Sequence, residues 1–426
     1  MKTIKNPDGL KTLALNFGLT AGALLFGVIV GEIGLRIAKI EYPPPPRSYE
    51  TPPVLPLYNF KHPYRGWAGN PGATAPWTGE GVQSQIKFNS GGFNDKERTK
   101  EKPANGFRIA LMGDSFTEEL YVPLELSYRA VVERELQSCP AFAGKQVEVL
   151  NFGVQGYSTA QALMTLRHDA WNYDPDMVIL NFYAGNDIRN NYRPLEHDHL
   201  RPFFVYQDGK LVEDMSFRNL DPDYKDPYQT SLIDRLPIGW VRNSRILQMI
   251  RKTELEAKKK QFMKDYEEIN IAFYKEPAPG SDWENAWKVS EDLIKLFQAE
   301  VYKKGADFLL ATISDSYQVL PNPQWQEDFK KIHGIKDLYY PDKRLAKLRE
   351  TDGIQVYNLA GPIWLEAKKR NKCLHGFDNA FKCGGHWNEE GNEVAGQIIA
   401  KYICDKYTEK FSQSSKSPAN TENTKK

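Results

Sequence analysis

Four polar positions, far apart in the chain, have the right types to carry out acyl transfer together. Ser115, Gly153 and Asn186 each follow a short apolar run, in "FRIALMGDS", "KQVEVLNFG" and "PDMVILNFYAGN". A serine hydroxyl is a nucleophile, and a glycine N–H and a carboxamide can stabilise the oxyanion that forms when a carbonyl is attacked. His386 precedes the last helical pattern, and its imidazole can take the Ser115 proton and return it to the leaving group.

These positions need a sheet to bring them together. Short apolar runs at residues 107–115, 145–154, 175–187, 306–314 and 354–360 alternate with helical patterns at 124–137, 158–173, 290–305, 344–353 and 388–407. Strands that alternate with helices indicate an α/β fold with a parallel sheet, covered by helices on both faces. Ligands of such sheets bind beyond the carboxyl ends of the strands, which is where these polar residues fall.

The same positions resemble the SGNH (GDSL-type) hydrolase superfamily, over about residues 105–405. "GDSFTE" keeps Gly-Asp-Ser but has Phe116 in place of the leucine, "NFGVQGYST" contains Gly153, "GND" contains Asn186, and the last block contains His386. The resemblance implies a flavodoxin-like three-layer α/β/α fold with a five-stranded parallel sheet. It also implies that Ser115 is the nucleophile and His386 the general base, with an oxyanion hole made by the Ser115 and Gly153 N–H groups and the Asn186 amide. It implies no cofactor and no metal.

One element of the family pattern is missing. The family commonly has an acid three residues before the histidine, but here that residue is Cys383. The nearest upstream acid is Asp378, and a disulfide between Cys373 and Cys383 could fold it toward the distal nitrogen of His386. Alternatively, Asp378 is a surface turn residue and the site is a Ser–His dyad whose ring is oriented by a backbone carbonyl.

Two other interpretations of the serines remain open. Asp114 or Ser115 could simply cap the helix that follows, because short polar residues commonly accept its first free N–H groups. Ser158 in "GYSTA" approaches the G-x-S-x-G nucleophile motif but lacks the last glycine, and it more naturally caps the next helix.

The composition restricts the class of protein. The chain has 426 residues with 56 Lys+Arg against 55 Asp+Glu, so no basic field favours nucleic acid as a partner. "MGDSFTE" lacks the lysine and spacing of a phosphate-binding loop. The four cysteines favour an oxidising compartment, and we expect the pairs Cys373–Cys383 and Cys139–Cys404. Without C-x-x-C spacing, a thiolate metal site is not expected.

The N-terminal region predicts a membrane anchor. Thr12 to Gly31 is a run of 20 uncharged residues, long enough to cross a hydrocarbon core of roughly 30 Å. A cleaved signal peptide is the alternative, but no A-x-A-like site follows the run. We therefore expect a cytoplasmic segment 1–11, an anchor 12–38, a proline-rich linker 39–60, a hydrolase-like domain 61–408 with an insertion at about 189–279, and a disordered tail 409–426.

Together these features predict a membrane-anchored serine esterase or O-acyltransferase outside the cytoplasm, in the periplasm if the source is bacterial. Its expected substrates are acyl esters, acetyl esters first among them, including those of cell-surface glycans. The aromatic residues of "WAGNPGATAPW" and Trp387 either stack on sugars or belong to the core. The alternative function is a non-catalytic glycan-binding or assembly module that keeps the scaffold. No protein partner is indicated.

Overall fold

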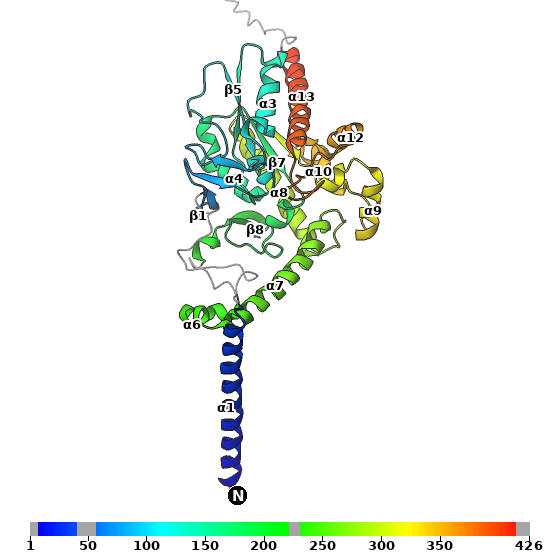
Figure 1. Cartoon of the computed structure of the whole chain (residues 1–426). Coiled ribbons are helices and arrows are strands. Elements are labelled where there is room, and N and C mark those ends of the chain that lie inside the picture. The colour runs from blue at the N-terminus through cyan, green and yellow to red at the C-terminus, as the bar shows by residue number, and fades with distance from the viewer. Residues whose placement is uncertain (1–6, 41–56, 221–230, 415–426) are drawn as a thin grey trace, which may run out of the picture. The chain divides into compact units, whose positions relative to one another are not determined.

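The structure, a computed structural model, describes residues 7–40, 57–220 and 231–414 (Figure 1). Contacts divide the chain into two compact units. We call residues 1–52 with 222–267 the anchor unit, and residues 53–221 with 268–426 the sheet unit. The sequence-based boundaries placed residues 222–267 inside the hydrolase-like domain, whereas their contacts group them with the N-terminal helix.

The sheet unit is built on one five-stranded parallel sheet. Its strands lie in the order β11-β10-β7-β5-β6, and every neighbouring pair is parallel. The strands are β5 (Gly106–Met112), β6 (Gln146–Asn151), β7 (Met177–Phe182), β10 (Asp307–Thr312) and β11 (Val356–Asn358). Numbered along the chain, the spatial order is 2-1-3-4-5, the flavodoxin-like order. The predicted fold class is confirmed.

Alternating side chains along each strand divide the core into two halves. On β5, Ile109 and Leu111 enter the half that packs against α3, α12 and α13, while Ala110 and Met112 enter the half that packs against α4 and α8. These helices are α3 (Tyr128–Gln137), α4 (Thr159–His168), α8 (Asp282–Lys303), α12 (Ala360–Arg370) and α13 (Glu389–Ser414). Both faces of the sheet are therefore covered, as a parallel sheet requires.

Several shorter elements complete the sheet unit. Two helices of a single turn follow strands of the sheet: α2 (Ser115–Glu118) follows β5, and α5 (Asp187–Asn190) follows β7. Three others lie between β10 and β11: α9 (Pro323–His333), α10 (Tyr340–Ala346) and α11 (Leu348–Asp352). The segment before the sheet forms two antiparallel pairs, β1 (Tyr58–His62) with β2 (Gly66–Gly69) and β3 (Thr74–Trp77) with β4 (Ser84–Lys87). Within the insertion, β8 (Phe203–Gln207) and β9 (Lys210–Asp214) form the expected hairpin around Asp208 and Gly209.

The anchor unit contains α1 (Pro7–Ile37), α6 (Ile238–Asn243) and the start of α7 (Arg245–Ala272). Residues Leu15–Ile37 are long and apolar enough to cross a membrane. The Glu32 carboxylate accepts hydrogen bonds from the Ser244 hydroxyl (3.1 Å) and from the backbone N–H groups of Arg245 (3.0 Å) and Ile246 (3.1 Å). Glu32 thus satisfies the first free N–H groups of α7, which explains why this part of the insertion groups with α1.

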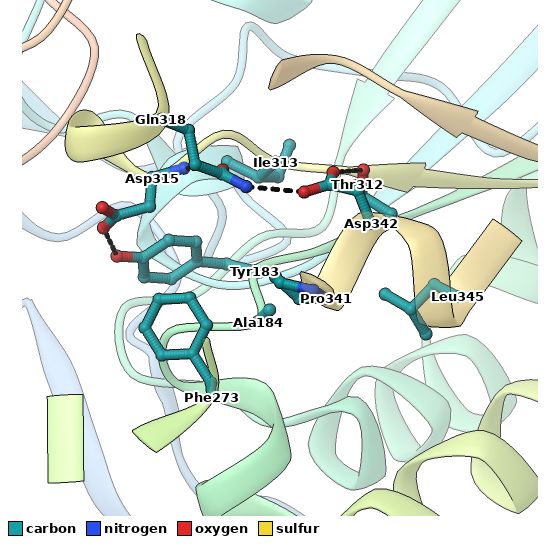
Figure 2. Close-up of a pocket in the computed structure, with 10 residues that line it drawn as sticks. All are labelled: Tyr183, Ala184, Phe273, Thr312, Ile313, Asp315, Gln318, Pro341, Asp342 and Leu345. Carbon is teal, nitrogen blue, oxygen red and sulfur yellow. Dashed lines mark hydrogen bonds between the residues drawn. The ribbon is translucent and has the colours of Figure 1, made fainter. Parts of the chain in front are cut away.

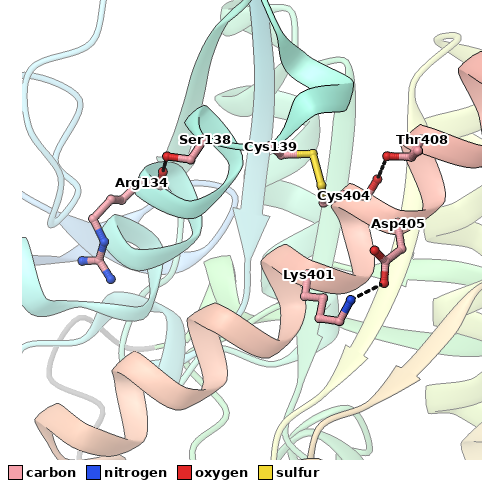
Figure 3. Close-up of a disulfide and its surroundings, with 7 residues drawn as sticks. All are labelled: Arg134, Ser138, Cys139, Lys401, Cys404, Asp405 and Thr408. Carbon is pink, nitrogen blue, oxygen red and sulfur yellow. Dashed lines mark hydrogen bonds and ion pairs between the residues drawn. A yellow bond between two sulfur atoms is a disulfide. The ribbon is translucent and has the colours of Figure 1, made fainter.

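Both expected disulfides are present. Cys139, just after α3, is bonded to Cys404 on α13 (Figure 3). Cys373 and Cys383 close the loop that precedes His386. At the ends of the expected linker and tail, β1 begins at Tyr58 and α13 continues to Ser414, so both elements extend into those segments. Residues 41–56 and 415–426 lie outside the described residues.

Candidate active site

Ser115 is the first residue of α2, at the carboxyl end of β5. The cap of this short helix is Asp114, whose side chain accepts a hydrogen bond from the Phe116 N–H at 3.0 Å. The Ser115 hydroxyl is instead 2.8 Å from Nε2 of His386. The capping role therefore belongs to Asp114, and the Ser115 hydroxyl is directed at an imidazole 271 residues away in the chain.

His386 is held by a carboxylate that the sequence analysis did not select. Oε2 of Glu80 lies 2.7 Å from His386 Nδ1, and Oε1 of Glu80 accepts the His386 backbone N–H at 2.9 Å. Because the carboxylate accepts the Nδ1 proton, Nε2 carries a lone pair toward the Ser115 hydroxyl. Burial alone would raise the pKa of Glu80, but hydrogen bonds from His386 and its charge outweigh burial, and the pKa lies below its ordinary value.

The turn that carries Glu80 connects β3 to β4 and is held by four hydrogen bonds to the side chains of Trp77 and Asn379. The Trp77 indole N–H donates to the Glu80 carbonyl at 2.7 Å. The Asn379 amide nitrogen donates to the carbonyls of Gly79 (3.1 Å) and Gly81 (2.7 Å), and its oxygen accepts the Gly81 N–H (3.2 Å). Asn379 belongs to the loop closed by the Cys373–Cys383 disulfide, so this loop positions the acid against the histidine.

A glycine beside the histidine makes the close approach of Glu80 possible. Gly385 has φ +68°, and a Cβ at this position would lie 2.2 Å from Glu80 Oε1. Any side chain there would both clash with the carboxylate and strain the backbone. The glycine that precedes His386 is therefore part of the geometry of the site.

The expectation that Asp378 would meet His386 is wrong, because Glu80 takes both the Nδ1 proton and the backbone N–H of His386. Asp378 is exposed and lines a surface groove together with Trp325, Phe377 and Lys382. The neighbouring Asn379 is the residue of this loop that reaches the site, through the Glu80 turn. The alternative of a Ser–His dyad oriented by a backbone carbonyl is excluded by the same contacts.

Two aromatic rings contact the imidazole. Tyr121 is stacked on His386 with a centroid distance of 3.9 Å and an interplanar angle of 18°, and the Phe116 ring lies 4.7 Å from it. Both rings are buried, so they restrict the rotation of His386 and exclude water from one part of its surroundings. Phe116, which replaces the leucine of the family motif, therefore contacts the site directly.

The predicted oxyanion donors Gly153 and Asn186 lie at the same edge of the sheet, but each already donates a hydrogen bond within the protein. The Asn186 amide nitrogen donates to Asp114 at 2.6 Å, which leaves its second hydrogen for another acceptor. The Gly153 N–H donates to the Asn151 side chain at 2.9 Å. A Cβ on Gly153 would lie 2.5 Å from the Glu118 nitrogen, so this glycine allows α2 to pack closely on the loop after β6.

A second histidine supports the loop that carries His386. His375 is 1% exposed, with Nδ1 2.7 Å from the Gly385 carbonyl and Nε2 3.1 Å from the Ser314 hydroxyl. The Trp387 indole N–H in turn donates to Ser314 at 3.0 Å. Burial lowers the pKa of His375 to about 4, so the ring is neutral and donates from Nδ1 to the carbonyl. This chain fixes the peptide between Gly385 and His386.

The rival nucleophile Ser158 has a structural role. It is the N-cap of α4 and forms a capping box with Gln161, and it is 1% exposed. Its side chain accepts the Gln161 N–H, as expected for a cap. Of the two candidate nucleophiles, Ser115 is therefore the one whose hydroxyl meets a histidine.

The aromatic residues suggested for sugar stacking are core or partly buried residues. Trp387 is 2% and Trp67 6% exposed, and Trp77 bonds to the Glu80 turn. A small cavity lies near the site, and Figure 2 shows Tyr183 and Asp315, bonded at 2.7 Å, in its lining. Ser115 does not line this cavity. Among the described residues, no group of three or more His, Cys, Asp or Glu side chains could hold a metal ion.

No family model matches the sequence, and no curated protein matches it. Among solved structures, an acetylxylan esterase from Geobacillus stearothermophilus is similar at 11% identity and TM-score 0.37, covering 72% of this chain and 96% of that one. A lipase/acylhydrolase from Enterococcus faecalis has 15% identity and TM-score 0.33, with 70% and 96% covered. A two-domain esterase active on acetylated mannans has 14% identity and TM-score 0.33, with 71% and 50% covered.

These likenesses are remote and carry no chemical argument. The strand order, together with Gly-Asp-Ser after the first strand of the sheet, does identify the architecture. The fold is the flavodoxin-like three-layer α/β/α arrangement that the resemblance to the SGNH hydrolases implied. Within this fold, the hydroxyl of Ser115 and the imidazole of His386 come from the positions that the sequence analysis selected. The acid comes from a hairpin that precedes the sheet.

Proposed function

We propose that this protein is an extracytoplasmic, membrane-anchored serine esterase or O-acyltransferase that works through an acyl-Ser115 intermediate. The observation that carries the proposal is the continuous hydrogen-bonded series from Glu80 to His386 to Ser115, with distances of 2.7 and 2.8 Å. A carboxylate, an imidazole and a hydroxyl in this order form the arrangement that activates a serine nucleophile. A helix cap or a structural hydrogen bond does not require all three.

In the proposed mechanism, His386 Nε2 removes the proton from Ser115 Oγ as the oxygen attacks the ester carbonyl. The C–O π bond breaks, and the negative oxygen is stabilised by the Ser115 N–H and the second amide hydrogen of Asn186, with Gly153 contributing if its N–H leaves Asn151. The intermediate then collapses, and the alcohol leaves with the proton held on His386. Glu80 keeps the ring oriented and stabilises the imidazolium throughout.

The second half of the reaction decides between hydrolysis and transfer. A water or a sugar hydroxyl gives its proton to His386, attacks the acyl-Ser115 carbonyl and releases the serine. Acetyl esters, including those of cell-surface glycans, are the proposed substrates. The groove beside the disulfide loop supports a glycan because Trp325, 47% exposed, lines it and offers an apolar face to a sugar ring.

The proposed location has two supports. The apolar segment Leu15–Ile37 is long enough to span a bilayer, and none of its described residues is buried in the structure. All four cysteines are paired in disulfides, which persist in oxidising compartments. The alternative function, a non-catalytic module, was favoured by the absence of an acid three residues before His386. Glu80 supplies a carboxylate to His386 from another part of the chain, so this argument for the alternative no longer applies.

The test uses the full-length protein in detergent or vesicles. We expect 4-nitrophenyl acetate hydrolysis by the wild type and a loss of about a thousandfold or more in Ser115→Ala. A fluorophosphonate should modify the peptide that contains Ser115 and leave the peptide that contains Ser158 unmodified. Equal rates for the wild type and Ser115→Ala, close to the uncatalysed rate, would refute the enzyme. Addition of an oligosaccharide acceptor then separates hydrolysis from transfer by the product formed.

A further inference from the structure

A row of exposed apolar residues lies beside the membrane-crossing helix in the anchor unit. Residues 235–240 are all exposed, among them Leu236 (36%), Ile238 (50%) and Trp240 (63%), and Leu232 just before them is 62% exposed. We call residues 232–246, which contain these side chains and α6, the collar segment. A soluble protein rarely leaves so many large apolar side chains adjacent and in water, so such a patch indicates an interaction surface.

The collar segment is fixed to one level of α1. Glu32 accepts hydrogen bonds from Arg245 and Ile246, and Arg36 donates to the Asn243 carbonyl at the end of α6. A Cβ on Gly31 would lie 3.3 Å from Ile246 Cδ1, so the two helices pack closely there. Glu32 is five residues before Ile37, where the apolar span ends, which places these contacts within about 8 Å of that end.

We propose that the collar segment lies in the headgroup layer of the bilayer, with Ile238 and Trp240 inserted among the lipids. The inference rests on the proposed membrane anchor. If Leu15–Ile37 crosses the hydrocarbon core, its last turns reach the membrane–water interface, and the contacts of Glu32 and Arg36 hold the collar segment at that depth. We infer that lipid covers the apolar row, because the contacts of Glu32 and Arg36 hold the collar segment beside the last turns of the apolar span.

The chemistry of the segment suits an interface. Tryptophan is enriched at membrane–water interfaces because its ring is apolar and its N–H is polar. Between Leu232 and Lys252 the chain has five cationic side chains, Arg235, Arg242, Arg245, Arg251 and Lys252, against the single acid Asp234. An apolar row flanked by cations binds the acyl boundary and the lipid phosphates together. Val241 of α6 is 1% exposed, so the helix also has a side that packs within the protein.

The experiment measures depth in vesicles of phosphatidylcholine and phosphatidylglycerol. No described cysteine is free, so an added thiol can be labelled without reducing the disulfides. The first variant, Ile238→Cys, is labelled with a fluorophore at the new cysteine and retains Trp240. The matched control is Ile332→Cys, labelled in the same way, because Ile332 lies on α9 and is 74% exposed in the wild type. We expect lipids spin-labelled near the headgroup to quench the label at 238 about threefold more than at 332, since interfacial segments sit roughly 5–10 Å deep. Adding Trp240→Glu should reduce this difference.

The outcomes separate the collar segment from the anchor. A protein that floats with vesicles but shows equal lipid quenching at 238 and 332 overturns the inference and leaves the anchor intact. A label at 238 that is protected from quenching by aqueous iodide but is not quenched by the spin-labelled lipids would indicate a contact between proteins. That result would also overturn the inference. A folded protein that does not float overturns the anchor and the collar segment together. Hydrolysis by Ser115 is measured separately and does not depend on either result.

Discussion

Glu80 holds His386 by two atoms at once: one carboxylate oxygen is 2.7 Å from Nδ1 and the other is 2.9 Å from the backbone nitrogen. The carboxylate therefore fixes both the ring and the peptide that carries it. Because the Glu80 side chain is 13% exposed, little water competes for these hydrogen bonds. The first prediction tests whether this carboxylate is the acid of the site.

Glu80→Gln should lower kcat for ester hydrolysis by about a hundredfold to ten-thousandfold, because an amide can leave the wrong tautomer of His386 and cannot stabilise the imidazolium. Asp378→Asn should leave kcat within about twofold, because its side chain is exposed and does not bond to the imidazole. Both are measured by steady-state kinetics with 4-nitrophenyl acetate. A larger loss for Asp378→Asn than for Glu80→Gln would restore the sequence-based assignment.

Asn186 is expected to act on the transition state. Asn186→Ala should reduce kcat by about a hundredfold and change KM little, because an oxyanion donor stabilises charge that is absent in the bound substrate. Loss of its hydrogen bond to Asp114 could also disturb the turn, so circular dichroism and thermal unfolding are recorded for the same variant. A rise in KM with kcat unchanged would place Asn186 in substrate binding instead.

Asn379 should act through Glu80. Asn379→Ala removes three hydrogen bonds to Gly79 and Gly81, so the acid is held less firmly and we expect kcat to fall about tenfold. In the Glu80→Gln background the same change should cost much less, because the group it positions is already lost. The double-mutant cycle distinguishes this coupling from general destabilisation. Independent, additive effects would contradict the positioning role.

The two disulfides should separate stability from activity. Cys139–Cys404 joins residues 265 apart in the chain, and in the chain-entropy model the loss of this disulfide lowers the free energy of unfolding by about 6 kcal/mol. The alanine pair at 139 and 404 should therefore unfold at lower temperature but keep its kcat at 20 °C, as long as it is folded. Cys373–Cys383 joins residues only 10 apart, and its loss should lower the free energy of unfolding by about 3 kcal/mol. Because this disulfide also constrains the loop of Asn379, the variant with alanine at both positions should lose activity even while it is folded. Calorimetry with parallel rate assays decides between these outcomes.

The pH dependence of stability should reflect His375. Its folded pKa, lowered by burial to about 4, lies below the unfolded value of 6.5. Between these values the unfolded chain binds a proton that the folded protein does not, so stability falls as pH drops from 6.5 to 4, by about 3 kcal/mol. His62, whose pKa burial also lowers to about 4, contributes in the same direction, whereas Glu118 and Glu119, whose pKa values burial raises to about 8, contribute in the opposite direction. His375→Asn should therefore lose less stability than the wild type, or gain more, when the pH falls from 7 to 5.

Urea unfolding at pH 7 and pH 5 measures this effect, with His333→Asn on α9 as the control. The control should keep the slope of the wild type. An unchanged slope in His375→Asn would show that other groups dominate acid unfolding.

Much of the fold follows from local patterns. The five strands of the sheet follow from short apolar runs, which are typical of buried parallel strands. Ser115 stands where the first of these runs ends, and His386 directly precedes the last helical pattern. Glu80 was not found because it lies 35 residues before Ser115 in a Gly- and Pro-rich segment without periodicity. Three glycines could have pointed to Glu80. Gly79 and Gly81 flank this acid in the sequence, and Gly385, beside His386, leaves the space that the Glu80 carboxylate occupies.

The engagement of Gly153 also lay beyond the sequence. A glycine after a strand predicts an accessible N–H, but this hydrogen bond goes to Asn151, two residues earlier. Such a local turn depends on side-chain rotamers that the spacing of residues does not determine. The grouping of residues 222–267 with α1 was missed for a related reason, since it depends on the Glu32 contacts with α7.

The 306 residues between Glu80 and His386 set the order of events during translation. The ribosome makes the acid first, the serine soon afterwards and the histidine near the end of the chain. All five strands of the sheet, the last ending at Asn358, precede His386, so a nascent chain can place Ser115 while its hydroxyl still lacks a base. The reactive state arises only after residue 386 has left the exit tunnel and the hairpin of Glu80 has closed on it, so incomplete chains cannot attack esters by this route.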